Sequence, residues 1–353
     1  MPLVHDFLEK MRQSHPWLLG KGRNAEASAV SEVLKFRGEA TSAAYWIPMD
    51  LDNIEELFSL ASAYPDKIGR SVRLAIAATL DFSRSTQIEA PIQIELSTDN
   101  GRKVLGPWCS PLTPPSIPGR LNIPKYRMWL ARILGMMSDG RPVGRNTFIT
   151  FNYDTVLEDT LDDLGVPFSY GFEKQEVAVV GRARGMHPKY EVKVLKIHGS
   201  VNWARSRQTN LTQLFPSYTE LRNKKLSPQL IPPSWKKSYH SLFSSIMDKA
   251  VAELSSASRI VVVGFSMPQT DVHFKYMLAA GLSDNISLQR MLFITPSAET
   301  LRERVQSQFK DLYVNNGRIS FITQTFGALA MDWNMLEAIE RPHPRDNSYC
   351  IYT

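Results

Sequence analysis

The residues of this sequence that are best suited to chemistry follow four short apolar segments. The segments and the residues after them are NTFIT with Asn152 and Asp154, EVKVLKI with His198 and Ser200, SRIVVV with Gly264, Phe265 and Ser266, and QRMLFI with Thr295. Short apolar and β-branched runs that stop at polar or small residues predict buried strands of a parallel sheet. Ligands of such sheets bind outside the carboxyl ends of the strands, so we expect these residues to face one cleft.

The residue types at the four strand ends favour a nucleotide ligand. Small residues at Gly264 and Ser266 let backbone amides approach a phosphate closely. An uncharged Asn152 and a titratable His198 handle sugar hydroxyls and water without a nucleophilic cysteine or a metal ion. The seven histidines show no His-x-x-x-His spacing, so no metal site is predicted and metal-dependent hydrolysis is disfavoured.

Each of these positions also has a purely structural interpretation. Asn152 and Asp154 are good caps for the helix that the following residues predict. A single histidine such as His198 is more often an ordinary buried or surface residue than a catalyst. Gly264 and Ser266 fit a plain turn from strand to helix. The argument for function is that all of them fall at equivalent strand ends.

The composition is that of a soluble globular protein with a substantial core. The chain has 353 residues, of which 43% are apolar and 22% charged. Its uninterrupted apolar runs, such as residues 260–263, fall far short of the roughly 18 residues that suggest a membrane span. The charges in MPLVHDFLEKM come too early for a signal peptide. We therefore expect a cytoplasmic protein.

The charge and the cysteine content limit which partners and which metal sites the sequence predicts. The net charge of +6 permits an acidic partner, but the basic residues are scattered, so a solvated basic surface is favoured over a nucleic-acid site. The two cysteines, Cys109 and Cys350, stand in unrelated contexts without a Cys-x-x-Cys pair. We expect free thiols, with neither a disulfide framework nor a structural zinc site.

The pattern along the chain predicts an α/β fold, a Rossmann-like and mostly parallel sheet with a helical insertion or subdomain. Residues 1–145 read mainly as helix, with a proline-rich connection at 106–120 and a helix from about 126 to 137. Residues 146–340 alternate strands and helices, and GRISFITQTF adds an edge strand before the helix ALAMDWNMLEAIE. Residues 341–353 are expected to form an irregular C-terminal tail.

Three ordered motifs resemble the sirtuin-like family, in particular its bacterial branch found in antiphage defence. They are FITFNYDTVLE at 148–158, VLKIHGSVNW at 194–203 and IVVVGFSMPQTDVHFKYML at 260–278. The resemblance covers most of residues 146–330. DNIEELFSL at 52–60 and IPPSWKKS at 231–238 are also similar to segments of that branch.

The resemblance implies an NAD-binding site and a role for each residue. Asn152 would orient the water or the nicotinamide ribose, Asp154 would support its loop, and His198 would contact the ribose hydroxyls and act as the base. The cofactor-binding set would be Gly264, Phe265 and Ser266 near phosphate, Thr295 near the adenosine ribose, and Ser200 at the start of the next segment. Gly199 would permit the sharp exit from the strand, and Trp203 would pack against the scaffold.

One departure from the family pattern concerns the beginning of the chain. Family members open with a buried strand and a glycine-rich turn around the NAD phosphates, whereas MPLVHDFLEKM resembles the helix after that turn. Either the native start lies upstream or this form lacks the loop. We expect the former, because loss of a central strand would leave neighbouring backbone groups unpaired. Under either explanation, we expect this chain to bind NAD weakly or not at all, and its enzymatic activity to be impaired.

Three functions follow from the resemblance. The first is hydrolysis of NAD to nicotinamide and ADP-ribose in a bacterial defence system, with activity gated by homo-oligomerisation or a partner protein. The second is a catalytically silent nucleotide-binding, scaffold or regulatory subunit. An NAD-dependent protein deacylase is disfavoured, because deacylating members carry a zinc module with two cysteine pairs. Residues 20–140 are the expected partner surface; nucleic acid is expected only indirectly, through a partner, and a membrane not at all.

Overall fold

The computed structural model describes most of the chain. The described residues are 6–44, 49–86, 92–95, 120–123, 125–136, 145–187, 189, 192–206, 208–209, 211–231, 241–265, 272–308, 319–331 and 348–352. The proline-rich connection at 106–119 and most of IPPSWKKS lie outside them, as do residues 332–340 of the helix predicted at ALAMDWNMLEAIE.

Buried apolar strands form the main sheet, which has seven strands within the described residues. They are β3 (Arg145–Thr150), β4 (Phe168–Ser169), β6 (Val192–Lys196), β11 (Arg259–Val263), β12 (Arg290–Thr295), β13 (Ile319–Thr323) and β14 (Ser348–Tyr352). Their order is β13-β12-β11-β14-β3-β6-β4, and every neighbouring pair is parallel. The predicted α/β fold, its four strands and the edge position of β13 are confirmed.

Helices between the strands bury their apolar sides in the core of this sheet. They are α5 (Lys125–Ile133), α6 (Val156–Asp163), α8 (Ser241–Ser256), α9 (Val272–Ser283), α10 (Ala298–Gln308) and α12 (Phe326–Met331). Phe148, Leu195, Phe293 and Trp129 are fully buried in this core. Near-continuous burial along the strands explains why they are runs of valine, isoleucine and leucine rather than alternating patterns.

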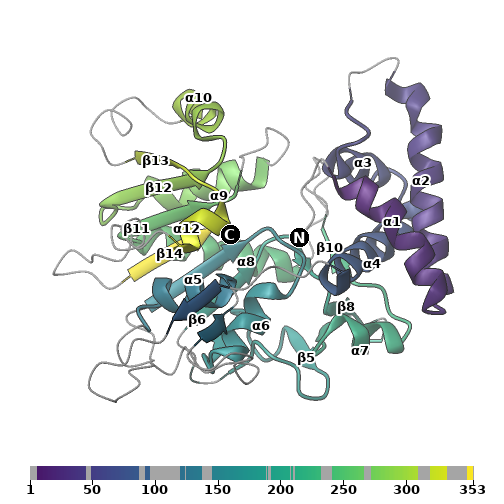
Figure 1. Cartoon of the computed structure of the whole chain (residues 1–353), viewed down its shortest axis with the longest axis horizontal. Coiled ribbons are helices and arrows are strands. Elements are labelled where there is room, and N and C mark those ends of the chain that lie inside the picture. Colours follow the sequence, from purple (N-terminus) through teal and green to yellow (C-terminus); the bar gives the residue numbers. More distant parts are fainter. Residues whose placement is uncertain are drawn as a thin grey trace.

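The N-terminal part is helical, as the sequence predicts. Its helices are α1 (Phe7–Gly20), α2 (Asn24–Ala44), α3 (Ile54–Ala61) and α4 (Arg70–Thr86), with a π-helical turn at Pro65–Gly69. Figure 1 shows them grouped at one end of the molecule. Asn53 caps α3 by accepting a hydrogen bond of 2.9 Å from the backbone N–H of Glu55. A two-stranded antiparallel ladder, β1 (Ile92–Glu95) with β2 (Arg120–Ile123), was not predicted.

The four helices have a second core that includes residues from 199–230, the excursion that follows β6. This excursion contains β7 (Gly199–Ser200), β8 (Trp203–Arg205), β9 (Thr212–Leu214), α7 (Tyr218–Asn223) and β10 (Gln229–Leu230), and β9 also pairs with β5 (Val177–Val179). Phe215 and Leu221 are buried in the helical core. The Tyr218 hydroxyl donates a 2.6 Å hydrogen bond to Glu26. The core of the helical portion therefore extends past the predicted boundary at residue 145.

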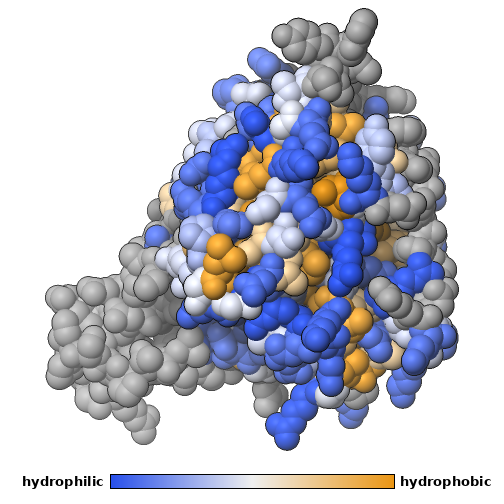
Figure 2. Space-filling model, turned by 90° about the vertical axis from the view of Figure 1, so that its right-hand side faces the viewer, coloured by the Kyte–Doolittle hydropathy of each residue, from blue (hydrophilic) through white to orange (hydrophobic). Residues whose placement is uncertain are grey.

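The outer face of the helical portion is mainly hydrophilic. Figure 2 shows this side of the molecule, with apolar residues divided from one another by hydrophilic ones. Leu19 and Tyr64 are the large apolar side chains of the helical portion with about half of their surface exposed, at 50% and 52%. Isolated apolar residues of this kind are normal on a protein surface. The use of residues 20–140 as a partner surface stays a prediction.

The expectation of an irregular C-terminal tail is wrong for residues 348–352. These residues form β14, which lies between β11 and β3 and pairs in parallel with both. A run of apolar and aromatic residues that follows a polar segment was read as an extension because no local signal places a strand at the centre of a sheet. The facing backbone edges of β3 and β11 therefore both pair with β14.

A buried carboxylate fastens α8 to the amino-terminal ends of β3 and β6. Glu253 accepts hydrogen bonds from Thr147 (2.8 Å) and Arg145 (3.0 Å), and it also pairs with Lys193. Burial alone would raise the pKa of Glu253, but the bonds from Lys193 and Thr147 and the nearby positive charges outweigh it and lower that pKa. The carboxylate is therefore stabilised in its charged form in the folded protein.

We expect Glu253→Gln to lower the free energy of unfolding by about 2 kcal/mol at neutral pH, because a charged hydrogen-bond acceptor is lost. A carboxyl group with a lowered folded-state pKa stabilises the protein above its unfolded-state pKa. The difference between variant and wild type should therefore vanish as pH falls through the lowered pKa. Urea unfolding across an acid pH series measures this. Exposed Glu303→Gln is the control, and an equal loss at every pH would contradict the assignment.

Candidate functional site

Parallel pairing brings the predicted site residues to one edge of the sheet. Thr150 at the end of β3 is in register with Lys196 at the end of β6. Val263 at the end of β11 is in register with Ile294 of β12. The loops that carry the predicted residues therefore all leave the sheet in the same direction.

An aromatic cluster joins three of these loops. Phe151, just after β3, stacks on Phe265, just after β11, with ring centroids 4.9 Å apart and planes 20° from parallel. The ring of His198 meets Phe151 edge-on at 5.0 Å and 78°. Phe274 of α9 closes the cluster at 4.6 Å from Phe265. Sequence reasoning missed Phe151 and Phe274, although the position of Phe151 beside Asn152 was a usable signal.

His198 is closely surrounded by other residues of the protein. Its side chain is buried, and Tyr153 lies on a second side with ring centroids 6.1 Å apart. The backbone carbonyl of His198 accepts a 2.9 Å hydrogen bond from the N–H of Ile231. The Tyr153 hydroxyl donates to the carbonyl of the same Ile231 at 2.7 Å. The imidazole is thus bordered by Phe151 and Tyr153 of the loop after β3, and the backbone of His198 is held by Ile231.

The loop after β3 presents one polar side chain and fixes another. Asn152 is exposed, and its backbone N–H donates to the Thr150 hydroxyl at 3.1 Å. Asp154 accepts a 2.9 Å hydrogen bond from the N–H of Val156 through Oδ1. Thr155 is the N-cap of α6, and Asp154, one residue earlier, satisfies the first amide of that helix. Asn152 is therefore the side chain of this pair that remains open to a ligand.

Gly199 makes the turn after His198 sterically feasible. Its φ is +84°, and a Cβ at this position would lie 2.2 Å from the carbonyl oxygen of Gln229. Both the conformation and the close approach of β10 therefore require glycine, as the sequence predicted.

The two residues after this turn belong to the interior. Ser200 is fully buried, and its hydroxyl donates to Asn202 Oδ1 at 2.6 Å. Asn202 in turn donates to the carbonyl of Phe215 at 2.9 Å. Trp203 is fully buried against Tyr170, which confirms its predicted packing role. The Ser200 hydroxyl thus bonds to another side chain of the protein, and its role in cofactor binding stays a prediction.

The predicted phosphate-binding turn is open to solvent at Gly264. This residue has φ +67°, and a Cβ there would meet nothing within 4 Å. Its N–H donates to the carbonyl of Ile294 at 2.9 Å. Ser266 lies outside the described residues. Thr295 is buried at the end of β12, four strand positions from β6, or roughly 19 Å away at the usual strand spacing.

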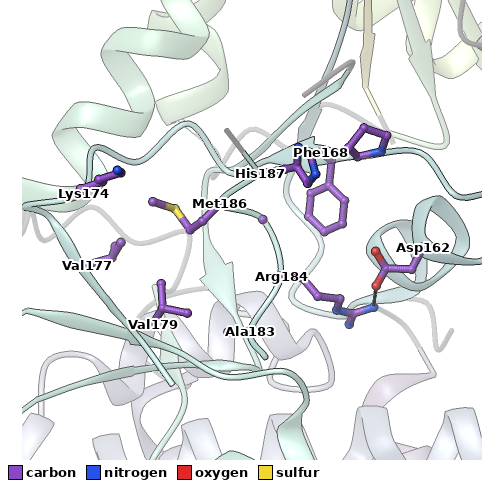
Figure 3. A pocket seen from close by; sticks show the side chains of 11 residues that line it. Asp162, Phe168, Lys174, Val177, Val179, Ala183, Arg184, Met186 and His187 are labelled. Atoms are coloured by element: carbon purple, nitrogen blue, oxygen red, sulfur yellow. Dashed lines mark hydrogen bonds and ion pairs between the residues drawn. The ribbon is translucent and has the colours of Figure 1, made fainter. Parts of the chain in front are cut away.

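The walls of two pockets in the described part of the chain include neither Asn152 nor His198. One of about 510 Å³ separates α4 from α6 and α7, with Asp154 and Thr155 in its wall. Arg84 of α4 reaches across it to Asp159 at 2.5 Å. The other, of about 660 Å³, is mainly apolar and lies beside β4 and β5; Figure 3 shows Arg184 paired with Asp162 at its side.

No helix among the described residues is long and apolar enough to cross a membrane. Within the same residues, no group of three or more histidine, cysteine, aspartate or glutamate side chains is arranged to hold a metal ion.

We expect Gly199→Ala to unfold more easily than a matched variant, Gly165→Ala. Gly165 has φ +70° and open space around it, so alanine there costs only the left-handed conformation, about 1–2 kcal/mol. Alanine at Gly199 must also displace β10, which adds about 1–3 kcal/mol. Urea unfolding followed by tryptophan fluorescence compares them. Equal losses would show that the contact with Gln229 does not constrain the turn.

One known protein family matches about half of the chain. Residues 146–317 match the SIR2-like domain family. No curated protein matches the chain. The matched segment begins in β3, ends just before β13, and contains every predicted site residue from Asn152 to Thr295. This match supports the sirtuin-like resemblance and an NAD-related function.

Proposed function

We propose that this protein is an NAD hydrolase that produces nicotinamide and ADP-ribose and serves in bacterial defence against phage. The activity is proposed from the SIR2-like match together with the site at the sheet edge. The defence role is proposed from the resemblance of the three sequence motifs to the antiphage branch.

The observation that carries the activity is the contact of Phe151 with both His198 and Phe265. It supports one continuous surface that runs from a titratable imidazole, past an aromatic wall, to the open turn at Gly264. A dinucleotide has a ring to pack against an aromatic wall and a pyrophosphate that suits an exposed backbone turn. In this proposal Gly264 and Phe265 face the phosphates and Thr295 lies toward the adenosine ribose, while a phosphate-binding role for Ser266 stays a prediction from the sequence.

The chemistry asks little of the protein beyond position and one base. Nicotinamide is a good leaving group, so the site must hold the ribose as it gains oxocarbenium character. The oxygen of water bonds to C1′ of the ribose as the bond to the nicotinamide nitrogen breaks, and that nitrogen keeps the electron pair. Asn152 orients the water or the ribose, and His198 accepts the proton of the water.

The test is nicotinamide release from NAD by the wild-type chain and three variants. We expect His198→Ala and Asn152→Ala each to lower the rate by at least about 100-fold, because the base or the oriented water is lost. His187→Ala is the matched control, since His187 is exposed and lies in the wall of the mainly apolar pocket. It should retain the wild-type rate.

Three other results would contradict the hydrolase. Release by His198→Ala at the wild-type rate would remove His198 from the mechanism. NAD binding without turnover would favour the silent nucleotide-binding subunit. Release that requires an acyl-lysine peptide would favour the deacylase.

We also propose that turnover is gated by assembly or by a partner protein, because unrestrained NAD loss is toxic to the cell. The purified monomer should hydrolyse NAD slowly, and the rate should rise with protein concentration or when the partner is added. Nicotinamide release measured across a concentration series, with the oligomeric state recorded by light scattering, checks this. Full turnover by a dilute monomer would rule the gating out.

A further inference from the structure

A fully buried ion pair lies directly beneath the candidate site. Lys196 Nζ is 2.9 Å from Glu158 Oε1, and the exposed fractions of the two side chains are 1% and 0%. Removing two charges from water is expensive, and the cost is recovered only when good geometry and further hydrogen bonds satisfy both groups. A buried pair of this kind is therefore weak support for stability by itself, and its additional contacts decide what it does.

The first additional contact ties the two site loops together. Lys196 Nζ also donates a hydrogen bond to the backbone carbonyl of Asp154. Lys196 ends β6, two residues before His198, whereas Asp154 belongs to the loop that presents Asn152. One ammonium group thus joins the strand that delivers the proposed base to the backbone of the loop that presents the proposed water-orienting amide.

The second additional contact reaches the turn after His198. The Tyr170 hydroxyl donates to Glu158 Oε1 at 3.2 Å, and Asn202 Nδ2 lies 3.5 Å from the same hydroxyl. Ser200 donates to Asn202. Burial, and then the charge of Glu158, raises the pKa of Tyr170 well above its usual value, so the hydroxyl keeps its proton for donation. The chain of bonds from Lys196 therefore returns to the turn that follows His198.

We infer that Lys196 is a positioning residue that fixes the Asn152 loop relative to His198. The inference deepens the proposed function and rests on it for its catalytic consequence. Displacement of a reacting group by about 1 Å is enough to cost on the order of 100-fold in rate. The bond from Lys196 to the Asp154 carbonyl holds the loop against such a displacement.

Two variants separate positioning from simple stability. Lys196→Met leaves the Glu158 carboxyl buried without its cation, so a large loss of stability is expected. The double variant Lys196→Met/Glu158→Gln is neutral at both positions and keeps an acceptor for Tyr170. Its melting temperature should recover most of that loss, but the bond to the Asp154 carbonyl stays absent. Its kcat for nicotinamide release should remain about 10- to 100-fold below wild type, with a KM for NAD close to that of wild type.

A recovery of kcat together with stability in the double variant would overturn the inference, because Lys196 would then act only by supporting the fold. Glu158→Gln alone is the matched control. It leaves the buried Lys196 ammonium without its anion, so its stability should also fall, but it keeps the bond to the Asp154 carbonyl. Measured below its melting temperature, its kcat should therefore stay above that of the double variant.

A second measurement decides the inference even if the wild-type chain does not release nicotinamide. Hydrogen exchange reports the amides of Asn152 and Val156, whose bonds to Thr150 and Asp154 depend on the loop conformation. In the double variant, exchange in a peptide that spans this loop should be faster by about tenfold or more, whereas residues 259–263 of β11 exchange as in wild type. Unchanged exchange in the loop would overturn the positioning role, independently of the proposed activity.

Discussion

The parallel pairing of β3 with β6 is the constraint on which the candidate site depends. Its register places Thr150 beside Lys196, so the loops that follow leave the sheet side by side. Phe151 and His198 are 47 positions apart in the chain, and this pairing puts their rings in edge-on contact at 5.0 Å. A slip of one residue would turn the side chains to the opposite face of the sheet and separate them.

Buried polar groups beneath the site restrict the conformation of the loops that carry Asn152 and His198. Lys196, Glu158, Tyr170 and Asn202 form a continuous set of buried contacts between β6, α6 and the turn at Ser200. Each unmet bond in such a place would cost free energy, so the set holds one arrangement of the backbone. The aromatic rings beside His198 limit the space that its side chain can occupy. The buried polar groups fix the backbone of the loops that carry His198 and Asn152.

The sheet edge also depends on a strand from the far end of the sequence. Because β14 lies between β3 and β11, the ends of those two strands are separated by two strand spacings, or roughly 10 Å. Phe151 and Phe265 are long enough to meet across that distance, and their stacking joins the two halves of the edge. The helical portion makes a separate contribution, since its core includes the excursion that follows β6.

The sequence by itself determined the strands, their common edge and the local turn chemistry. Apolar runs that end at Asn152, His198 and Gly264 are local patterns, and so are the need for glycine at Gly199 and the bond of Asp154 to the first amide of α6. Only the tertiary structure decided that residues 348–352 enter the centre of the sheet, that Ser200 is buried in a polar network, and that Lys196 bonds to Glu158 and the Asp154 backbone. These features are contacts between segments distant in the chain, and no local periodicity or turn signal encodes which distant groups will meet.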